Sequence, residues 1–461
     1  MKEKNKYLIK NFGVFAIGSF GSKILAFLLV PLYTTVLNTD DYGSVDIVVS
    51  TASLLAPILL LSVFDAVLRF GMDPDYRNGD VLSTAFNIAL KGNILLIFFS
   101  LLLGGVRAFG ISNEYLIFLC AYFMIDTFNQ IFNLHLKAVN KATIIAVGGI
   151  ANTFISCMLN VLLLLVFKWG VVGYMVSNTL GGLVQLLYQL WFGEIYKDIK
   201  IYGYNNLSKP MLTYSYPLIP NSISLWLNNA CDRYILTLFT SMAEIGVYSI
   251  AYKIPTILAM FQGIYYNAWS ISAIKEFDKD DTDGFIGSNY TIYSLVSLFA
   301  CSGLLIINVP LASFLYQGDF FRAWQCVPFL LMGTVFSGIA QFEGSLFAAT
   351  KNTRAVAKTT IVGAAVNVVC NFILIFFVGI IGAALATFIG YMITWIMRTK
   401  YLNSFVKMRV DWKAHYASVF IVSIQSVMAT IGSDSLLQIF ASFLLVMINR
   451  KNVVLGVRKF I

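Results

Sequence analysis

The chain has 461 residues; 58% are hydrophobic, only 12% are charged, and the mean hydropathy is +0.77. A water-soluble protein of this length could not bury so much apolar surface, so the composition excludes a soluble globular fold. Solid runs of Leu, Ile, Val and Phe, without strict alternation, also exclude a transmembrane β-barrel. The formal net charge of +9 follows from basic residues that flank the apolar runs, so we expect no nucleic-acid partner.

Apolar runs of about 20 residues, long enough to cross a bilayer as a helix, recur along the chain. The segment 1–10 is basic, and the apolar run after it is too long for a signal peptide, so we expect it to be the first spanning helix. The sequence predicts an all-α integral membrane protein of fourteen helices, at residues 11–37, 45–68, 83–105, 114–136, 142–167, 171–195, 212–240, 246–273, 288–309, 324–350, 355–378, 380–397, 414–432 and 435–449.

The loops between these helices orient the chain. Nearly all Lys and Arg residues outside the predicted helices fall on the side of the N-terminus, Arg398 among them. The opposite side receives only Arg107, Lys168 and Arg322. Basic residues collect in cytoplasmic loops, and an even number of helices returns the chain to its starting side. Both termini are therefore predicted to be cytoplasmic.

Two segments of the chain resemble each other at a spacing of about 210 residues. Each carries a basic turn, an Asn in the middle of a helix and a G-x-x-G turn, in the same order. The first copy has them at 136–141, Asn160, Gly170 and Gly173, and the second at 346–351, Asn371, Gly379 and Gly382. Both copies enter the membrane from the same side, which predicts two parallel six-helix repeats with a substrate site at their interface.

The repeat sets the predicted division of the chain. Residues 1–196 form an N-terminal six-helix bundle, and 197–210 form a cytoplasmic linker. Residues 211–404 form the C-terminal six-helix bundle. Residues 405–461 hold two additional helices and a cytoplasmic tail.

Four cations fall well inside predicted helices: Lys23, Lys91, Arg233 and Lys253, whereas Lys358, at the start of the predicted helix 355–378, is counted with the cytoplasmic side. A charge at bilayer depth costs roughly 2.5–3.5 kcal/mol on insertion scales, so an intramembrane cation is expected to have a use. Lys23 lies too deep to reach the interface, whereas Lys91 lies close enough for its ammonium to snorkel. A structural salt bridge is the alternative role for these cations.

Arg233 is the main candidate among these cations for binding an anionic substrate. Asp232 precedes it, but adjacent helical residues point about 100° apart, so we expect Asp232 not to neutralise it. A guanidinium is always charged and matches phosphate oxygens with two parallel donors. Several cations around one cavity would suit an anionic substrate.

Other charged residues have a structural alternative that the sequence favours. Arg69 lies four residues after Asp65, the spacing of a helical ion pair, although a role at the cavity entrance stays open. Four acidic residues inside predicted helices are candidates for an ion-coupling site: Asp46, Asp126, Asp232 and Glu343. Each could pair with a cation, carry a coupling proton or bind sodium, and pairing is favoured. The cysteines form no C-x-x-C pair, and no metal or catalytic set is predicted.

With these residues in view, the chain resembles the Wzx-type oligosaccharide-lipid flippases. These are the polysaccharide branch of the multidrug/oligosaccharidyl-lipid/polysaccharide (MOP) exporter superfamily. The resemblance covers roughly residues 8–400. The matching features are Pro31 and Tyr33, Tyr42-Gly43, Arg69-Phe70, Asp232-Arg233-Tyr234, Gly246-Val247-Tyr248, Ala251-Tyr252-Lys253 and the repeated Asn and G-x-x-G positions.

The resemblance implies two six-helix bundles in a V shape around a cationic cavity. It implies alternating access that carries a polyprenyl-diphosphate-linked oligosaccharide from the inner to the outer leaflet of a bacterial plasma membrane, for O-antigen, capsule or exopolysaccharide assembly. Lys23, Lys91, Arg233, Lys253 and Arg69 would bind the substrate. No cofactor is expected beyond a coupling Na⁺ or H⁺. Membrane lipids and other polysaccharide-assembly membrane proteins are the expected partners.

Three alternatives stay open. A multidrug extruder of the same superfamily moves organic cations and would be expected to have an anionic cavity. A lipid II flippase also has fourteen helices. A membrane polysaccharide polymerase or ligase, which would be an enzyme, usually needs a sizeable external loop with catalytic Arg or His, whereas the largest predicted external loop, 310–323, holds one Arg and no His. A non-enzymatic transporter is therefore the favoured interpretation.

Overall fold

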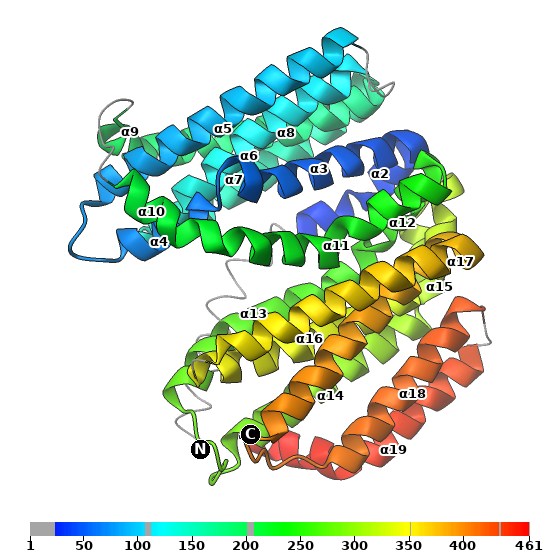
Figure 1. Ribbon diagram of the computed structural model, residues 1–461. Coiled ribbons are helices and arrows are strands. Elements are labelled where there is room, and N and C mark those ends of the chain that lie inside the picture. The colour runs from blue at the N-terminus through cyan, green and yellow to red at the C-terminus, as the bar shows by residue number, and fades with distance from the viewer. Residues whose placement is uncertain (1–23, 107–111, 201–206, 351, 433–434, 461) are drawn as a thin grey trace. The chain divides into compact units, whose positions relative to one another are not determined.

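The computed structural model describes residues 24–106, 112–200, 207–350, 352–432 and 435–460 (Figure 1). Within these ranges the chain is helical apart from short turns, and no strand occurs. Eight of the described helices are long and apolar enough to cross a membrane. The protein is an all-α, multi-pass membrane protein, as the sequence predicts.

The described chain forms two compact units, Gly21–Trp226 and Leu227–Ile461, so the division falls within α11. We call them the N-terminal unit and the C-terminal unit. The predicted linker at 197–210 lies upstream of this division. The N-terminal unit contains α2 (Val30–Val36), α3 (Thr39–Leu59), α4 (Val63–Gly71), α5 (Asn78–Val106), α6 (Asn113–Ala138), α7 (Ala142–Val161), the π turn η2 (Leu162–Val166), α8 (Gly170–Phe192), α9 (Ile195–Asp198), α10 (Ser208–Ser215), η3 (Tyr216–Leu218) and the start of α11 (Ile219–Phe239).

The C-terminal unit continues from α11 to the last helix. It contains α12 (Met242–Ala251), α13 (Lys253–Lys275), α14 (Phe285–Ile306), α15 (Asn308–Leu315), η4 (Gly318–Gln325), α16 (Val327–Ala349), α17 (Thr353–Asn403), α18 (Trp412–Thr430) and α19 (Ser435–Phe460). The pair α18 and α19, which the sequence places outside the repeat, packs against α14, and α18 also contacts α16.

Several predicted helices are broken or joined in the structure. The predicted helix 45–68 is two helices, because Leu61 and Ser62 adopt positive φ between α3 and α4. The predicted helix 246–273 is divided at Tyr252 into α12 and α13. The predicted helices 355–378 and 380–397 are the two halves of α17, which breaks at Val378 and Gly379. Much of the predicted helix 11–37 lies outside the described residues.

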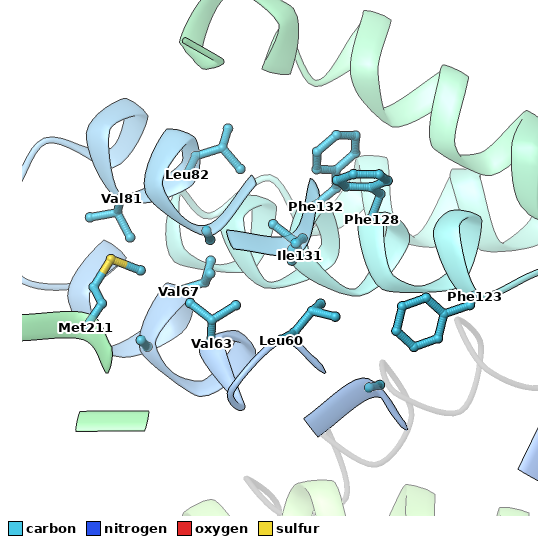
Figure 2. Packing of buried hydrophobic residues seen from close by; sticks show 14 of the residues in the cluster. Leu60, Val63, Val67, Val81, Leu82, Phe123, Phe128, Ile131, Phe132 and Met211 are labelled. Carbon is cyan, nitrogen blue, oxygen red and sulfur yellow. The ribbon is translucent and has the colours of Figure 1, made fainter. Parts of the chain in front are cut away.

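Mainly aliphatic side chains, together with several Phe rings, fill the core of the N-terminal unit. Figure 2 shows this packing. The helices α3, α4, α5, α6 and α10 contribute, and the labelled residues are Leu60, Val63, Val67, Val81, Leu82, Phe123, Phe128, Ile131, Phe132 and Met211. The C-terminal unit also buries aromatic rings, and the ring of Trp269 stacks on Phe342 with centroids 4.1 Å apart.

The two copies of the repeat have the same local geometry. Asn160 and Asn371 are both buried, and each donates from Nδ2 to the carbonyl four residues earlier, at 2.8 and 3.0 Å. Gly170 and Gly379 both have positive φ, which glycine adopts without strain. These shared features support the predicted repeat within each unit.

Hydrogen bonds between helices also recur at the repeat spacing. In the N-terminal unit Gln189 of α8 donates to the side-chain oxygen of Asn133 in α6, at 2.8 Å. In the C-terminal unit Thr399 of α17 donates to Glu343 in α16, at 2.6 Å. Each pair is separated from its counterpart by the same stretch of about 210 residues. The second copy therefore places a carboxylate where the first has an amide.

Candidate functional site

The centre of the candidate site is Asp232, in α11 of the C-terminal unit. Its carboxylate is buried, and both oxygens accept hydrogen bonds. Oδ1 accepts from the backbone N–H of Arg233 at 2.9 Å and from Arg233 Nη1 at 3.2 Å. A buried carboxylate without such partners would be costly, so these bonds offset part of the cost of burying Asp232.

Two tyrosines complete the coordination of Asp232. Tyr248 of α12 and Tyr252, the residue between α12 and α13, both donate to Oδ2, the latter at 3.0 Å. Their hydroxyls lie 3.0 Å apart, and Tyr248 also lies 3.5 Å from Thr387 Oγ1 in α17. The break between α12 and α13 brings both tyrosines to one carboxylate. In the sequence the two tyrosines stand out only as parts of family motifs, and nothing there places them at the site.

The expectation that Asp232 leaves Arg233 unneutralised is wrong. The guanidinium bends back along α11, so that Nη1 also donates to the carbonyl of Asn229 at 2.9 Å. The 100° between neighbouring Cβ directions does not keep the two groups apart, because the Arg233 side chain is long enough to span it. The Arg233 guanidinium also lies over the ring of Tyr252, with Cζ 5.0 Å from the centroid. Only 12% of the Arg233 side chain is exposed.

Polar residues of α17 lie beside Asp232 and the residues that bond to it. Asn367 lies 3.5 Å from Thr387 Oγ1, and it accepts from the Cys231 thiol at 3.4 Å. Asn371 donates to the side-chain oxygen of Asn367 at 3.1 Å. Tyr391 donates to Asn229 at 2.8 Å. The sequence identifies the mid-helix Asn371 as part of the repeat. Only the structure shows that Asn371 bonds to Asn367, which accepts from Cys231, the residue before Asp232.

The other predicted substrate-binding cations do not join Asp232. Lys253, at the start of α13, is partly buried, and Lys91 is exposed on α5. Neither forms an ion pair with any described residue. Lys23 lies outside the described residues. Arg233 and Lys253 belong to the C-terminal unit, and Lys91 and Arg69 to the N-terminal unit.

Arg69 differs from its predicted pairing. Its Nη1 lies 3.4 Å from Asp73, the next acidic residue toward the C-terminus, and not against Asp65. Asp65 is exposed one turn earlier on α4. Because 59% of the Arg69 side chain is exposed, this is a surface ion pair of small energetic worth.

The acidic candidates other than Asp232 have separate surroundings. Asp126 of α6 accepts from Gln130 at 2.7 Å and lines a cavity in the N-terminal unit. Asp46 is partly buried in α3. Glu343 is fully buried and accepts from Thr399, while its Oε2 has no hydrogen-bond partner among the described residues.

Arg398 is a buried cation, although the sequence predicts that it lies in a loop on the cytoplasmic side. It lies within α17, is 6% exposed, and reaches back to α16 and to the first half of α17. Its guanidinium donates to the Ala340 carbonyl at 2.6 Å, to Thr359 at 3.1 Å and to Thr360 at 2.7 Å. Its position near a predicted helix end gave no sign of this burial.

Comparison with known proteins decides the family. The sequence profile described as "Polysaccharide biosynthesis protein" matches residues 8–270, more than half of the chain. The chain belongs to this family. The resemblance to the polysaccharide branch of the superfamily is thereby confirmed.

Two curated proteins are related to this family member at low identity. The "Probable low-salt glycan biosynthesis flippase Agl15" of Haloferax volcanii is 21% identical over 279 residues, which are 58% of each chain. The "Uncharacterized membrane protein MJ1068" of Methanocaldococcus jannaschii is 26% identical over 191 residues, 38% of this chain and 36% of that protein. The chain thus matches little more than half the length of the first relative, and about a third of the second.

Solved structures show the same fold. The lipid II flippase MurJ in an inward closed conformation gives a TM-score of 0.69 at 17% identity, over 95% of this chain and 99% of MurJ. An inward-facing multidrug resistance MATE transporter of the MOP superfamily gives 0.63 at 14% identity, over 83% and 95%. The family member therefore has the MOP transporter fold.

Proposed function

We propose that this protein is a flippase that moves polyprenyl-diphosphate-linked oligosaccharide repeat units from the inner to the outer leaflet by alternating access. The observation that carries the proposal is membership of the polysaccharide biosynthesis family together with a transporter fold. The similarity to a protein named as a probable glycan biosynthesis flippase supports the same class of cargo. The transported repeat units would be used to assemble a surface polysaccharide such as O-antigen, capsule or exopolysaccharide.

Arg233 is the residue that we assign to the diphosphate. Its guanidinium is largely buried and is held by Asn229, Asp232 and the Tyr252 ring. A diphosphate offers oxygens that a guanidinium binds with parallel donors. Lys23, Lys91, Lys253 and Arg69 are the further cations that we propose to bind the substrate.

The ion pair between Arg233 and Asp232 offers a way to couple substrate to a cation. While Asp232 is charged, it competes with phosphate for the guanidinium. If H⁺ or Na⁺ neutralises Asp232, Arg233 loses that partner and gains affinity for the substrate. A ligand shifts a conformational equilibrium only by its differential affinity for the two states, and this exchange would supply such a difference. Asp46, Asp126 and Glu343 are the other carboxylates that could hold the coupling ion.

In this proposal the protein lies in a bacterial plasma membrane with both termini cytoplasmic. It needs no cofactor beyond the coupling ion and catalyses no covalent change. Membrane lipids surround it, and other membrane proteins of polysaccharide assembly would supply or consume its cargo.

Reconstitution into proteoliposomes tests this function. A fluorescent polyprenyl-diphosphate oligosaccharide is placed in both leaflets, and the fraction that a membrane-impermeant quencher reaches is followed in time. We expect the protein to accelerate exchange between leaflets, and Arg233→Ala to lower the rate. No acceleration, combined with uptake of the cationic dye ethidium, would reject the proposal in favour of a drug extruder.

A further inference from the structure

The N-terminal unit contains a polar cavity of about 370 Å³ between α3, α6, α7 and α8. This volume lies in the range of about 300–1,000 Å³ that is typical of small-molecule sites. Six side-chain amides line it: Asn129, Gln130, Asn133, Asn152, Asn178 and Gln185. So many amides in membrane-spanning helices are costly unless they bond to each other or to a ligand.

The charge of this cavity differs from that of the Asp232 site. The described residues that line it include one carboxylate, Asp126, and no Lys or Arg. A diphosphate would meet no cation among these residues, and an ionised Asp126 would repel it. The lining therefore does not suit the charged end of the proposed substrate.

Hydrogen bonds between helices fix several of the amides. Asn152 of α7 donates to the Gln185 oxygen at 2.8 Å, Gln189 of α8 donates to the Asn133 oxygen at 2.8 Å, and Asn129 of α6 donates to the Gly182 carbonyl at 2.9 Å. The lining side chains are thus held by contacts across α6, α7 and α8 before any ligand binds, which lowers the entropic cost of binding.

These bonds leave both donors and acceptors unused. Within the described part of the chain, the amide nitrogens of Asn133 and Gln185 have no partner. The amide oxygen of Asn178 is also without one, because its nitrogen donates to the Tyr174 carbonyl in its own helix at 2.9 Å. Asp126 Oδ1 is a further acceptor, since Gln130 occupies only Oδ2.

A mixed set of donors and acceptors selects among ligand classes. Phosphate offers only acceptors and calls for donors, whereas sodium calls for oxygens alone. A sugar hydroxyl both donates and accepts, so it can use every group in this set. The rings of Tyr122 and Tyr174 also line the cavity and provide apolar faces for the C–H face of a pyranose.

We infer that this cavity is a glycan-binding pocket, which takes uncharged, hydroxyl-rich sugar residues of the cargo. The inference rests on the proposed function, because it assigns the sugar part of the same lipid-linked substrate. The diphosphate is assigned to Arg233 and the glycan to the amide-lined cavity.

The test compares two lipids that differ only in the sugar. Purified protein in detergent is titrated with polyprenyl diphosphate and, separately, with the polyprenyl-diphosphate oligosaccharide fraction extracted from the source cells. The Kd of each lipid is measured. The variant is Asn178→Leu. The Asn178 amide bonds only within its own helix, so this substitution breaks no hydrogen bond between helices. The control is Asn160→Leu, a buried Asn of α7 with the same type of intrahelical bond and no place in the cavity lining.

We expect wild type to bind the glycosylated lipid more tightly than the sugar-free lipid. Asn178→Leu should reduce this preference about three- to tenfold, the loss of one neutral hydrogen bond. Asn160→Leu should keep it, and both variants should bind the sugar-free lipid as wild type does.

Each part of the account can fail separately. If wild type binds neither lipid, the proposed flippase function fails. If wild type prefers the glycosylated lipid and Asn178→Leu keeps the full preference, the glycan pocket is overturned while the flippase function stands. Binding of ethidium that competes with the glycolipid and is lost in Asp126→Asn would also overturn it, because the cavity would then be a cation site.

Discussion

The hydroxyl of Tyr248 in α12 donates to the buried carboxylate of Asp232 in α11, beside the Arg233 guanidinium that binds the other carboxylate oxygen. Asp232 therefore links Arg233, the cation assigned to the diphosphate, to Tyr248 of α12, whose hydroxyl lies 3.5 Å from Thr387 of α17. Any event that neutralises Asp232 would act on Arg233 and on the position of α12 together. The following predictions test this arrangement and the packing that supports it.

Tyr248→Phe removes one donor to Asp232 without changing the volume of the ring. Tyr252 still donates to the same oxygen, so we expect the free energy of unfolding to fall by about 0.5–1.5 kcal/mol, the net contribution of one hydrogen bond, and lipid exchange to become slower. Denaturation of the purified protein in detergent measures the first effect. Tyr293→Phe is the control, since Tyr293 is also a buried tyrosine of the C-terminal unit but is not one of the residues that bind Asp232. Equal stability of the two variants would contradict the role of the Tyr248 bond.

Gly181→Ala tests the close approach of α7 and α8. A Cβ at Gly181 would lie 1.9 Å from Ser156 Oγ and 2.9 Å from the Asn152 carbonyl, so the helices would have to separate. We expect a loss of about 1–3 kcal/mol in the free energy of unfolding. Gly149→Ala in α7 is the matched control, because its Cβ would meet no atom within 4 Å. It should be neutral or stabilising by up to about 1 kcal/mol through helix propensity. The same cost in both variants would reject the tight crossing.

Arg398→Gln tests whether this cation is a structural part of the C-terminal unit. Its guanidinium connects the second half of α17 to Ala340 in α16 and to Thr359 and Thr360. Loss of charged hydrogen bonds should lower the free energy of unfolding by at least about 1.5–3 kcal/mol. Arg354→Gln, an exposed basic residue of the same helix, should change it by less than about 0.5 kcal/mol. If Arg398→Gln is equally silent, Arg398 is a surface cation as the sequence predicts.

The sequence predicts the helical membrane fold because long apolar runs have few other solutions in a bilayer. It also predicts the repeat, since Asn160 and Asn371, and Gly170 and Gly379, share the same geometry in the two units. It does not predict the helix breaks at Leu61–Ser62 and at Tyr252, because the apolar run continues on both sides of each break.

The candidate site was predicted only in part. Arg233 and Asp232 stand out as charges in an apolar run, but their mutual bond depends on side-chain torsions that the sequence does not give. Tyr248, Tyr252 and Thr387 come from three segments, and their meeting depends on packing. Arg398 illustrates the opposite error, because a basic residue near a predicted helix end is usually solvated, yet here α16 and α17 enclose it.

The central claim is that Arg233 binds the diphosphate of a lipid-linked glycan. We would measure the thermal unfolding midpoint of purified protein as polyprenyl-diphosphate oligosaccharide is added, for wild type, Arg233→Ala and Arg322→Ala. Arg322 is a matched control, because it too is an arginine of the C-terminal unit in an ion pair, with Glu244 at 2.8 Å, but it lies on the exposed η4 segment. A ligand that binds only the folded state at about 100 times its Kd stabilises it by about 2.7 kcal/mol. The account predicts a raised midpoint in wild type and Arg322→Ala and a much smaller rise in Arg233→Ala; an equal rise in all three proteins would contradict it.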